Sequence, residues 1–395
     1  PGMESARALD RQIKLLRAYA ALTYPFACVP FLWFWFDDLG ITAPEYATLI
    51  SVYYVTMVIA EVPTGLLADR FGPRRALITG PLLLALGFVV IGTSTTFPAF
   101  CAGEALLGLG HSILSGPPAA LLFESLRRRG RAAEFHHQEA IANTARLLGT
   151  AGAFLLGGAL VSAVDIPTAI HATAGLCALA AVCAWFLEDL EGSAARQADK
   201  AGPSLLRHAL ADLRRPAVAW LLAYYVVLFA LLRFPFHTYQ PYLREVGAED
   251  PLAIGFLFFA LNLVAAPCSR LTPWLCRRFG PIPLFWAMPL LISLSLLLMA
   301  GRPDGLGIAL FFVHQIPFGM HWAVIQDFAN HRIGSEARAT TLSILSFTGR
   351  IVFSIAFPLA MSLPSLTDAY FWTGVIGTAA TILVLLAGRR ITRAP

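Results

Sequence analysis

The fold of this chain is decided by the stretch Gly65-Leu66-Leu67-Ala68-Asp69-Arg70-Phe71-Gly72-Pro73-Arg74-Arg75, which separates two long apolar runs. It contains one acid, three arginines and two glycines. Charges this dense between two apolar segments indicate a short polar loop that joins two membrane spans. The adjacent glycine and proline indicate that the chain turns inside this loop.

Composition supports a membrane protein with many spans. The 395 residues are 57% hydrophobic and only 13% charged, too few charges to cover a soluble surface. At about 20 apolar residues per span, this length allows roughly twelve helices. The net charge of +5 fits basic loops that set topology better than it fits nucleic-acid binding. The six cysteines lie in or beside apolar runs and indicate small core residues.

Apolar runs predict six spans on each side of a polar linker. We therefore expect an N-terminal bundle over residues 3–187, a linker over 188–215 and a C-terminal bundle over 216–395. Outside the spans nearly all Lys and Arg fall on one side, which predicts that both termini and the linker are cytoplasmic. The twelve predicted spans are 18–36, 43–66, 76–95, 97–123, 138–162, 166–187, 216–242, 252–275, 282–300, 305–329, 339–361 and 367–387.

The two halves repeat each other in sequence. Thr64–Pro73 aligns with Thr272–Pro281, and the shared residues include an Arg-Phe-Gly-Pro run. At similar offsets His111 aligns with His314, and Arg146 with Arg350. Duplicated six-helix halves are a common plan of secondary transporters, whose substrate site lies between the halves.

In its sequence repeat and in the loop around Asp69, the chain resembles the major facilitator superfamily. Gly65, Leu67, Ala68, Asp69, Arg70 and Gly72 fit the family pattern of this loop, whereas Pro73 replaces a basic residue and Arg74 and Arg75 follow one place late. The preceding Glu61–Gly65 resembles a drug-efflux-like bacterial branch. The resemblance implies an all-α integral membrane fold with twelve transmembrane helices in two pseudo-symmetric six-helix bundles.

The resemblance gives the loop residues a gating role. Asp69 would pair with basic groups or a helix N-terminus of the other half when the cytoplasmic side is closed. The alternative is a solvated charge that serves topology only. Within the second span, Glu61 needs a partner. Arg350 of the eleventh span is the candidate across the halves, and Arg146 is the alternative within the same half.

The fourth span carries Glu104, Gly108, His111 and Ser115 at spacings that place them on one helical face. The resemblance implies that this helix lines the central cavity, where Glu104 and His111 could exchange protons. The alternatives are a structural acid and a hydrogen-bonded core histidine. The cavity is also expected to include the following residues of the seventh and tenth spans: Arg233, His237, Gln240, His314 and His321.

Arg233 could bind an anionic substrate group or neutralise Glu104. We assign no role to Arg270. These features predict a proton-coupled secondary transporter of the inner membrane that exports an amphiphilic or drug-like compound as an antiporter. The alternative is an uptake or facilitative carrier for a metabolite, anionic if Arg233 anchors it. We expect no enzyme activity, no cofactor or metal, no nucleic-acid partner and a monomer in the lipid bilayer, with a small molecule and protons as partners.

Overall fold

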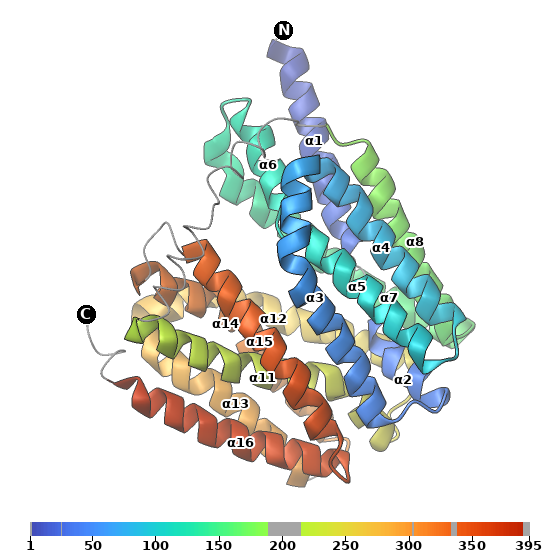
Figure 1. The fold of residues 1–395 in the computed structure, drawn as a ribbon, viewed down its shortest axis with the longest axis vertical. Coiled ribbons are helices and arrows are strands. Elements are labelled where there is room, and N and C mark those ends of the chain that lie inside the picture. Colours follow the sequence, from blue (N-terminus) through green and yellow to red (C-terminus); the bar gives the residue numbers. More distant parts are fainter. Residues whose placement is uncertain (1, 25, 189–214, 302–303, 333–337, 390–395) are drawn as a thin grey trace. The chain divides into compact units, whose positions relative to one another are not determined.

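A computed structural model describes residues 2–24, 26–188, 215–301, 304–332 and 338–389. Ten helices of this described part are long and apolar enough to cross a membrane. The other two expected spans correspond to α3, which is 29 residues long, and to the segment α1–η1–α2. The chain is therefore an all-helical multi-pass membrane protein (Figure 1).

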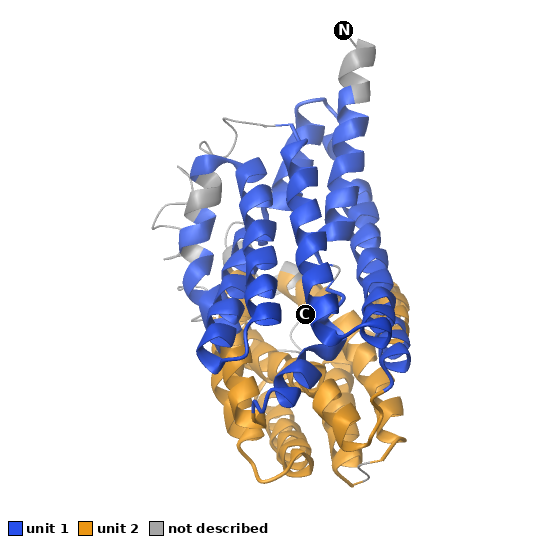
Figure 2. Cartoon of the chain, turned by 90° about the vertical axis from the view of Figure 1, so that its right-hand side faces the viewer, with its two compact units in different colours: residues 1–41, 52–201, 250–259 blue, residues 42–51, 202–249, 260–395 orange. Residues whose placement is uncertain are grey.

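The chain forms two compact units, shown in Figure 2. Unit 1 comprises residues 1–41, 52–201 and 250–259, and unit 2 comprises residues 42–51, 202–249 and 260–395. The linker predicted over 188–215 lies outside the described residues except at its ends. The elements up to that linker are α1 (Gly2–Thr23), η1 (Val29–Phe31), α2 (Leu32–Asp38), α3 (Ala43–Phe71), α4 (Pro73–Thr93), α5 (Phe97–Leu114), α6 (Pro117–Arg127), η2 (Ala132–Glu134), α7 (Phe135–Ala163) and α8 (Ile166–Trp185).

The second half of the chain repeats the helix pairing of the first. In unit 1, α4 packs against both α5 and α8, and α1 packs against α7. In unit 2, α13 packs against α14 and α16, and α11 against α15. The elements of this half are α11 (Pro216–Glu245), α12 (Pro251–Phe279), α13 (Pro281–Gly301), α14 (Gly307–Arg332), α15 (Arg338–Met361) and α16 (Leu366–Ala387).

Proline marks many helix starts. A first helical residue has no intrahelical partner for its N–H, so proline loses nothing there and its fixed φ suits the helix. Two of these prolines follow the glycines of the repeated turn, Gly72 and Gly280, whose φ values are +88° and +77°. Helices α4, α6, α11, α12 and α13 begin in this way, at Pro73, Pro117, Pro216, Pro251 and Pro281.

Small residues bring α7 into close contact with α1 and with the segment that follows α1. A Cβ on Gly149 would meet the backbone of Ala21, and a Cβ on Gly157 would meet the backbone of Ala27. Such close approach is the usual way in which membrane helices gain packing energy, because lipid gives them no hydrophobic drive to associate. Gly149 and Gly157 of the fifth span therefore serve close packing.

Candidate functional site

Two of the predicted spans of unit 1 are interrupted. The span predicted over 18–36 is divided, because α1 ends at Thr23 and η1 begins at Val29. The span predicted over 97–123 crosses as one apolar segment, but Gly116 at φ +117° separates α5 from α6 (Figure 1). Pro117 then restarts the helix. Interrupted helices are a frequent source of substrate and ion sites in transporters, because they release backbone polar groups inside the membrane.

Neighbouring helices satisfy backbone groups at the first interruption. The N–H of Cys28 donates to the hydroxyl of Thr173 in α8, at 3.1 Å. The hydroxyl of Thr150 in α7 donates to the carbonyl oxygen of Tyr24, also at 3.1 Å. Side chains of packed helices thus replace the helical hydrogen bonds that are lost here, as non-helical backbone at membrane depth requires.

His111 joins the two interruptions. It lies in the last turn of α5, and its Nδ1 is 3.0 Å from the carbonyl oxygen of Leu107. Its ring centroid is 5.7 Å from that of Tyr24, 5.5 Å from Phe26 and 5.4 Å from Tyr53. The histidine is therefore held in an aromatic box whose walls come from the first interruption and from α3.

Glu104 lies two turns before His111 in the same helix. Its side chain is only 4% exposed. Within the described residues it has no hydrogen bond and no ion pair, and its electrostatic neighbours are the thiols of Cys28 and Cys101. A carboxyl group buried without a partner is costly as an anion, so burial favours the protonated acid in this conformation.

Arg146 of α7 borders the same region. Its guanidinium carbon is 5.7 Å from the ring centroid of Tyr24, and its Nη2 donates to Asn143 at 2.7 Å. Asn143 is one acceptor of this arginine within its own helix. The predicted pairing of Glu61 with Arg350 stays a prediction, since Glu61 lies in α3 of unit 1 and Arg350 in α15 of unit 2.

In unit 2, Arg233 lies near the middle of α11 and is half-buried. Its guanidinium carbon is 5.3 Å from the ring centroid of Phe229, 5.8 Å from Phe236 and 5.9 Å from Phe318. The guanidinium also interacts electrostatically with the imidazoles of His237 and His321. Three of the residues predicted for the cavity, Arg233, His237 and His321, are therefore brought together.

The other predicted residues of unit 2 lie deeper. His314 is 2% exposed, and its Nδ1 is 3.2 Å from the hydroxyl of Tyr239. Gln315 donates to the same hydroxyl at 3.3 Å. Gln240 is also buried, at 4% exposure. His314 thus belongs to a buried polar cluster with Tyr239, whereas its sequence counterpart His111 lies at a helix end.

The stretch Gly65–Arg75, predicted as a loop, is almost entirely helical: α3 continues to Phe71 and α4 begins at Pro73, so only Gly72 lies between the two helices. Arg70 lies over the ring of Phe71 at 5.6 Å, and Gly65 lies on an exposed face of α3. Arg74 donates from Nη2 to the carbonyl oxygen of Trp185, at the end of α8. Arg75 is exposed. The side chain of Asp69 lies outside the described part, so its gating role stays a prediction.

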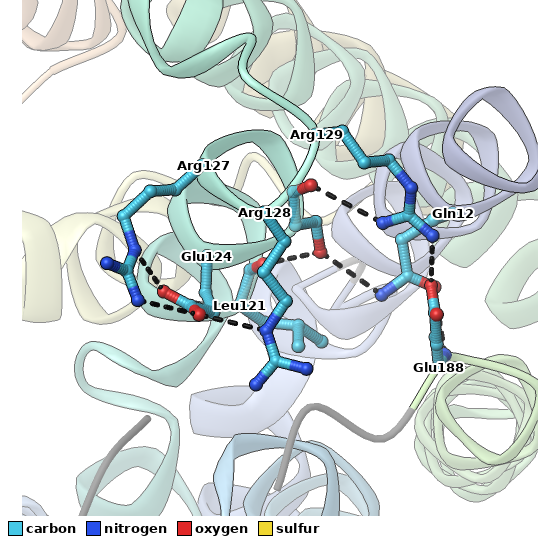
Figure 3. Close-up of polar contacts among 8 residues, drawn as sticks. Gln12, Leu121, Glu124, Arg127, Arg128, Arg129 and Glu188 are labelled. Atoms are coloured by element: carbon cyan, nitrogen blue, oxygen red, sulfur yellow. Dashed lines mark hydrogen bonds and ion pairs between the residues drawn. The ribbon is translucent and has the colours of Figure 1, made fainter. Parts of the chain in front are cut away.

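Three arginines at the end of α6 are held by two acids (Figure 3). Glu124 accepts hydrogen bonds from Arg127 at 2.7 Å and from Arg128 at 2.9 Å. Arg129 instead bonds Glu188 at 2.7 Å, and the N–H of Glu188 donates to Gln12 of α1 at 2.9 Å. These contacts tie together the helix ends of unit 1 beside the linker.

The sequence did not predict which aromatic rings surround His111 and Arg233. Phe26, Tyr53, Phe229, Phe236 and Phe318 reach them from other helices or other turns. One signal was available for the first site. The run Ser115-Gly116-Pro117-Pro118 and the prolines 25 and 30 interrupt apolar segments, which in transporters points to a binding site.

Comparison with known proteins agrees with this architecture. A model described as Major Facilitator Superfamily matches residues 18–358. The crystal structure of nucleoside transporter NupG, in a mutant form, has a TM-score of 0.81 at 15% identity and covers 98% of this chain and 100% of that one. The identity is low, so this similarity speaks for the fold alone.

Two curated relatives match over shorter stretches. "Multidrug resistance protein MdtH" of Aeromonas hydrophila is 30% identical over 132 residues, which is 33% of each chain. A "Probable L-galactonate transporter" of Escherichia coli is 29% identical over 97 residues, 24% of this chain and 21% of the relative. The chain thus spans a third or less of the length of these relatives, and they differ in what their names say they carry.

Proposed function

Because this chain belongs to the Major Facilitator Superfamily, we propose that it is a proton-coupled secondary transporter that exports an amphiphilic, drug-like compound. In this proposal the two six-helix halves alternate access to a central site. The chain acts as an antiporter in the inner membrane, with both termini and the linker in the cytoplasm. It works as a monomer, and Asp69 closes its cytoplasmic side.

Glu104 carries the proposal. Its carboxyl group is buried and has no hydrogen bond or ion pair among the described residues. In this conformation burial favours the neutral acid, and a conformation that admits water would release the proton. A proton taken up on one side and released on the other would thereby move inward as the compound moves outward. The group that binds the proton changes only between carboxylic acid and carboxylate.

The surroundings of His111 support an aromatic or amphiphilic cargo. Three aromatic rings surround the imidazole, with ring centroids within 5.7 Å. Two come from the interruption after α1 and one comes from α3. Aromatic side chains offer large apolar faces, while Tyr and His keep one polar end each. A planar amphiphile matches these groups better than a small polar solute does.

The test uses proteoliposomes with an imposed pH gradient and three fluorescent probes: ethidium as cation, Nile red as neutral compound and carboxyfluorescein as anion. We expect gradient-driven movement of at least one probe. Glu104→Gln should abolish that movement but keep exchange of the same probe across the membrane without a gradient. Glu249→Gln, an exposed acid paired with Arg244, is the matched control and should behave as wild type. Movement of no probe, or full gradient-driven movement in Glu104→Gln, would contradict the proposal.

A second candidate is an uptake or facilitative carrier for an anionic metabolite. Arg233 favours it, because this intramembrane cation has no hydrogen bond or ion pair within the described part of the chain. The same proteoliposomes separate the two candidates by direction. Accumulation of carboxyfluorescein on the proton-receiving side supports uptake, and its depletion from that side supports export.

A further inference from the structure

Arg233 is an intramembrane cation whose position is not explained by an end of its helix. It lies near the middle of α11, which spans Pro216–Glu245. Long basic side chains near helix ends can extend to the membrane surface, but a mid-helix arginine must be accommodated inside the protein. Ionisable groups at such positions usually mark the path of a substrate or an ion.

The described part of the chain provides Arg233 with ring faces and no anion. Its guanidinium carbon lies within 6 Å of the ring centroids of Phe229, Phe236 and Phe318. Phe236 and Phe318 are parallel, with an interplanar angle of 2° and centroids 6.4 Å apart. Among the described residues no acid pairs with this arginine and no group accepts a hydrogen bond from it.

Cation–π contacts leave the hydrogen-bonding capacity of the guanidinium unused. The attraction acts between the cation and the ring face and consumes none of the five N–H donors. Those donors form a rigid planar fork that matches a carboxylate in two parallel hydrogen bonds. The half-buried position of Arg233 keeps it within reach of a ligand.

We infer that unit 2 holds a carboxylate-binding subsite in which Arg233 binds the head of an amphiphilic organic anion and the phenylalanine rings contact its apolar body. The inference rests on the proposed function only in taking this ligand as the transported compound. His237 and His321, which interact with the Arg233 charge, border the subsite.

The surroundings define the class of anion. A single arginine matches a single negative charge, so a monocarboxylate fits better than a phosphate dianion. Three phenyl rings offer few partners for hydroxyl groups, and a polyhydroxy acid would lose its hydration without replacement. The carboxylate of an aryl or alkyl monocarboxylate accepts hydrogen bonds from the guanidinium, and its apolar body is stabilised by contact with the phenylalanine rings.

Binding to the purified full-length protein in detergent tests the inference without any proton gradient. The probes are phenylacetate, its neutral amide phenylacetamide, and gluconate as a polyhydroxy acid, each measured by thermal stabilisation. We expect phenylacetate to bind about tenfold or more tightly than either comparison compound. Arg233→Gln should remove the preference for acid over amide, and Arg233→Lys should keep part of it.

Two controls keep the result interpretable. Arg278→Gln removes an arginine that lies over the single ring of Phe279, at 5.5 Å, and should leave phenylacetate binding unchanged. If Arg233→Gln fails to fold, the wild-type protein still decides the question, because bound phenylacetate should protect Arg233 from modification by phenylglyoxal.

Equal binding of acid and amide, absence of protection, or no binding by any probe would overturn the inference. These outcomes are separate from those of the transport test. Absence of the acid preference in the wild-type protein, with intact Glu104-dependent transport, would reject the subsite alone. Intact acid binding without gradient-driven transport would reject the proton coupling alone.

Discussion

Gly72 and Gly280 both have a positive φ at equivalent places in the two halves, with values of +88° and +77°. Each is followed by a proline that begins the next helix, α4 or α13. The sequence repeat Arg-Phe-Gly-Pro thus gives both halves a positive-φ glycine followed by a helix that begins with proline. A residue with a Cβ rarely adopts a positive φ, so the backbone at both positions favours glycine.

Gly72→Ala and Gly280→Ala should each destabilise the protein. Holding a residue with a Cβ at such a positive φ costs roughly 1–3 kcal/mol, and the two turns lie in separate units, so the two effects should add. Thermal unfolding of the purified protein measures both. Gly175→Ala is the control, because it lies in α8 with nothing near a new Cβ and should be neutral or slightly stabilising. Equal melting temperatures for all variants would refute the requirement.

Gly157→Ala should disturb the packing of α7 against the segment between α1 and η1. Its new methyl group would overlap the backbone of Ala27, which a rotamer change cannot relieve. We expect a loss of about 1–3 kcal/mol, read from thermal unfolding. In the same helix, Gly152→Ala meets nothing within 4 Å and should keep wild-type stability. A Gly157→Ala variant as stable as Gly152→Ala would show that this packing has little energetic weight.

The start of α8 should make stability depend on pH. The Thr168 side chain, with its backbone N–H, hydrogen-bonds the Asp165 carboxylate and lowers its pKa below its ordinary value of about 3.8. Because the pKa is lower in the folded protein, the ionised carboxylate stabilises the fold. This stabilisation is complete at pH values above the ordinary pKa and is lost as the pH falls through the folded-state pKa. Asp165→Asn keeps the capping oxygen but cannot titrate. The wild-type protein should exceed it in melting temperature at neutral pH by a margin that disappears under acid conditions; a constant margin would argue against the charge.

The predicted pair of Glu61 and Arg350 can be tested by exchange of charge. Glu61→Arg and Arg350→Glu should each reduce transport in proteoliposomes at least tenfold, because a charge left alone within the membrane is costly. The double variant should recover much of the loss, since the two charges would again attract. Arg146→Glu combined with Glu61→Arg is the comparison for the alternative pair. Recovery in that combination alone would assign the partner to Arg146.

The sequence was sufficient for the fold class but not for the interruptions. Apolar runs and the repeat around Gly72 predicted a membrane protein of two six-helix halves, and the family match confirms it. The breaks at 24–28 and at Gly116 were predicted as parts of unbroken spans. Hydropathy averages over about 20 residues, so a few glycine, serine and proline residues inside an apolar run hardly change it.

For the site, the sequence located the charged residues and missed their surroundings. The spacing in the fourth span placed Glu104 and His111 on one face, and the two lie in one helix, α5, as expected. The rings of Tyr53 and Phe26 come from α3 and from the interruption after α1. Contacts of this kind depend on how helices pack, which local periodicity does not encode.

The two halves differ in the continuity of equivalent helices. His111 and His314 occupy equivalent positions in the aligned repeat. One copy now lies in the last turn of α5, where the helix ends, and the other inside α14, which runs on through Gly319. The imidazoles at equivalent positions of the repeat therefore have two different chemical environments, so the halves can differ in chemistry while sharing one topology.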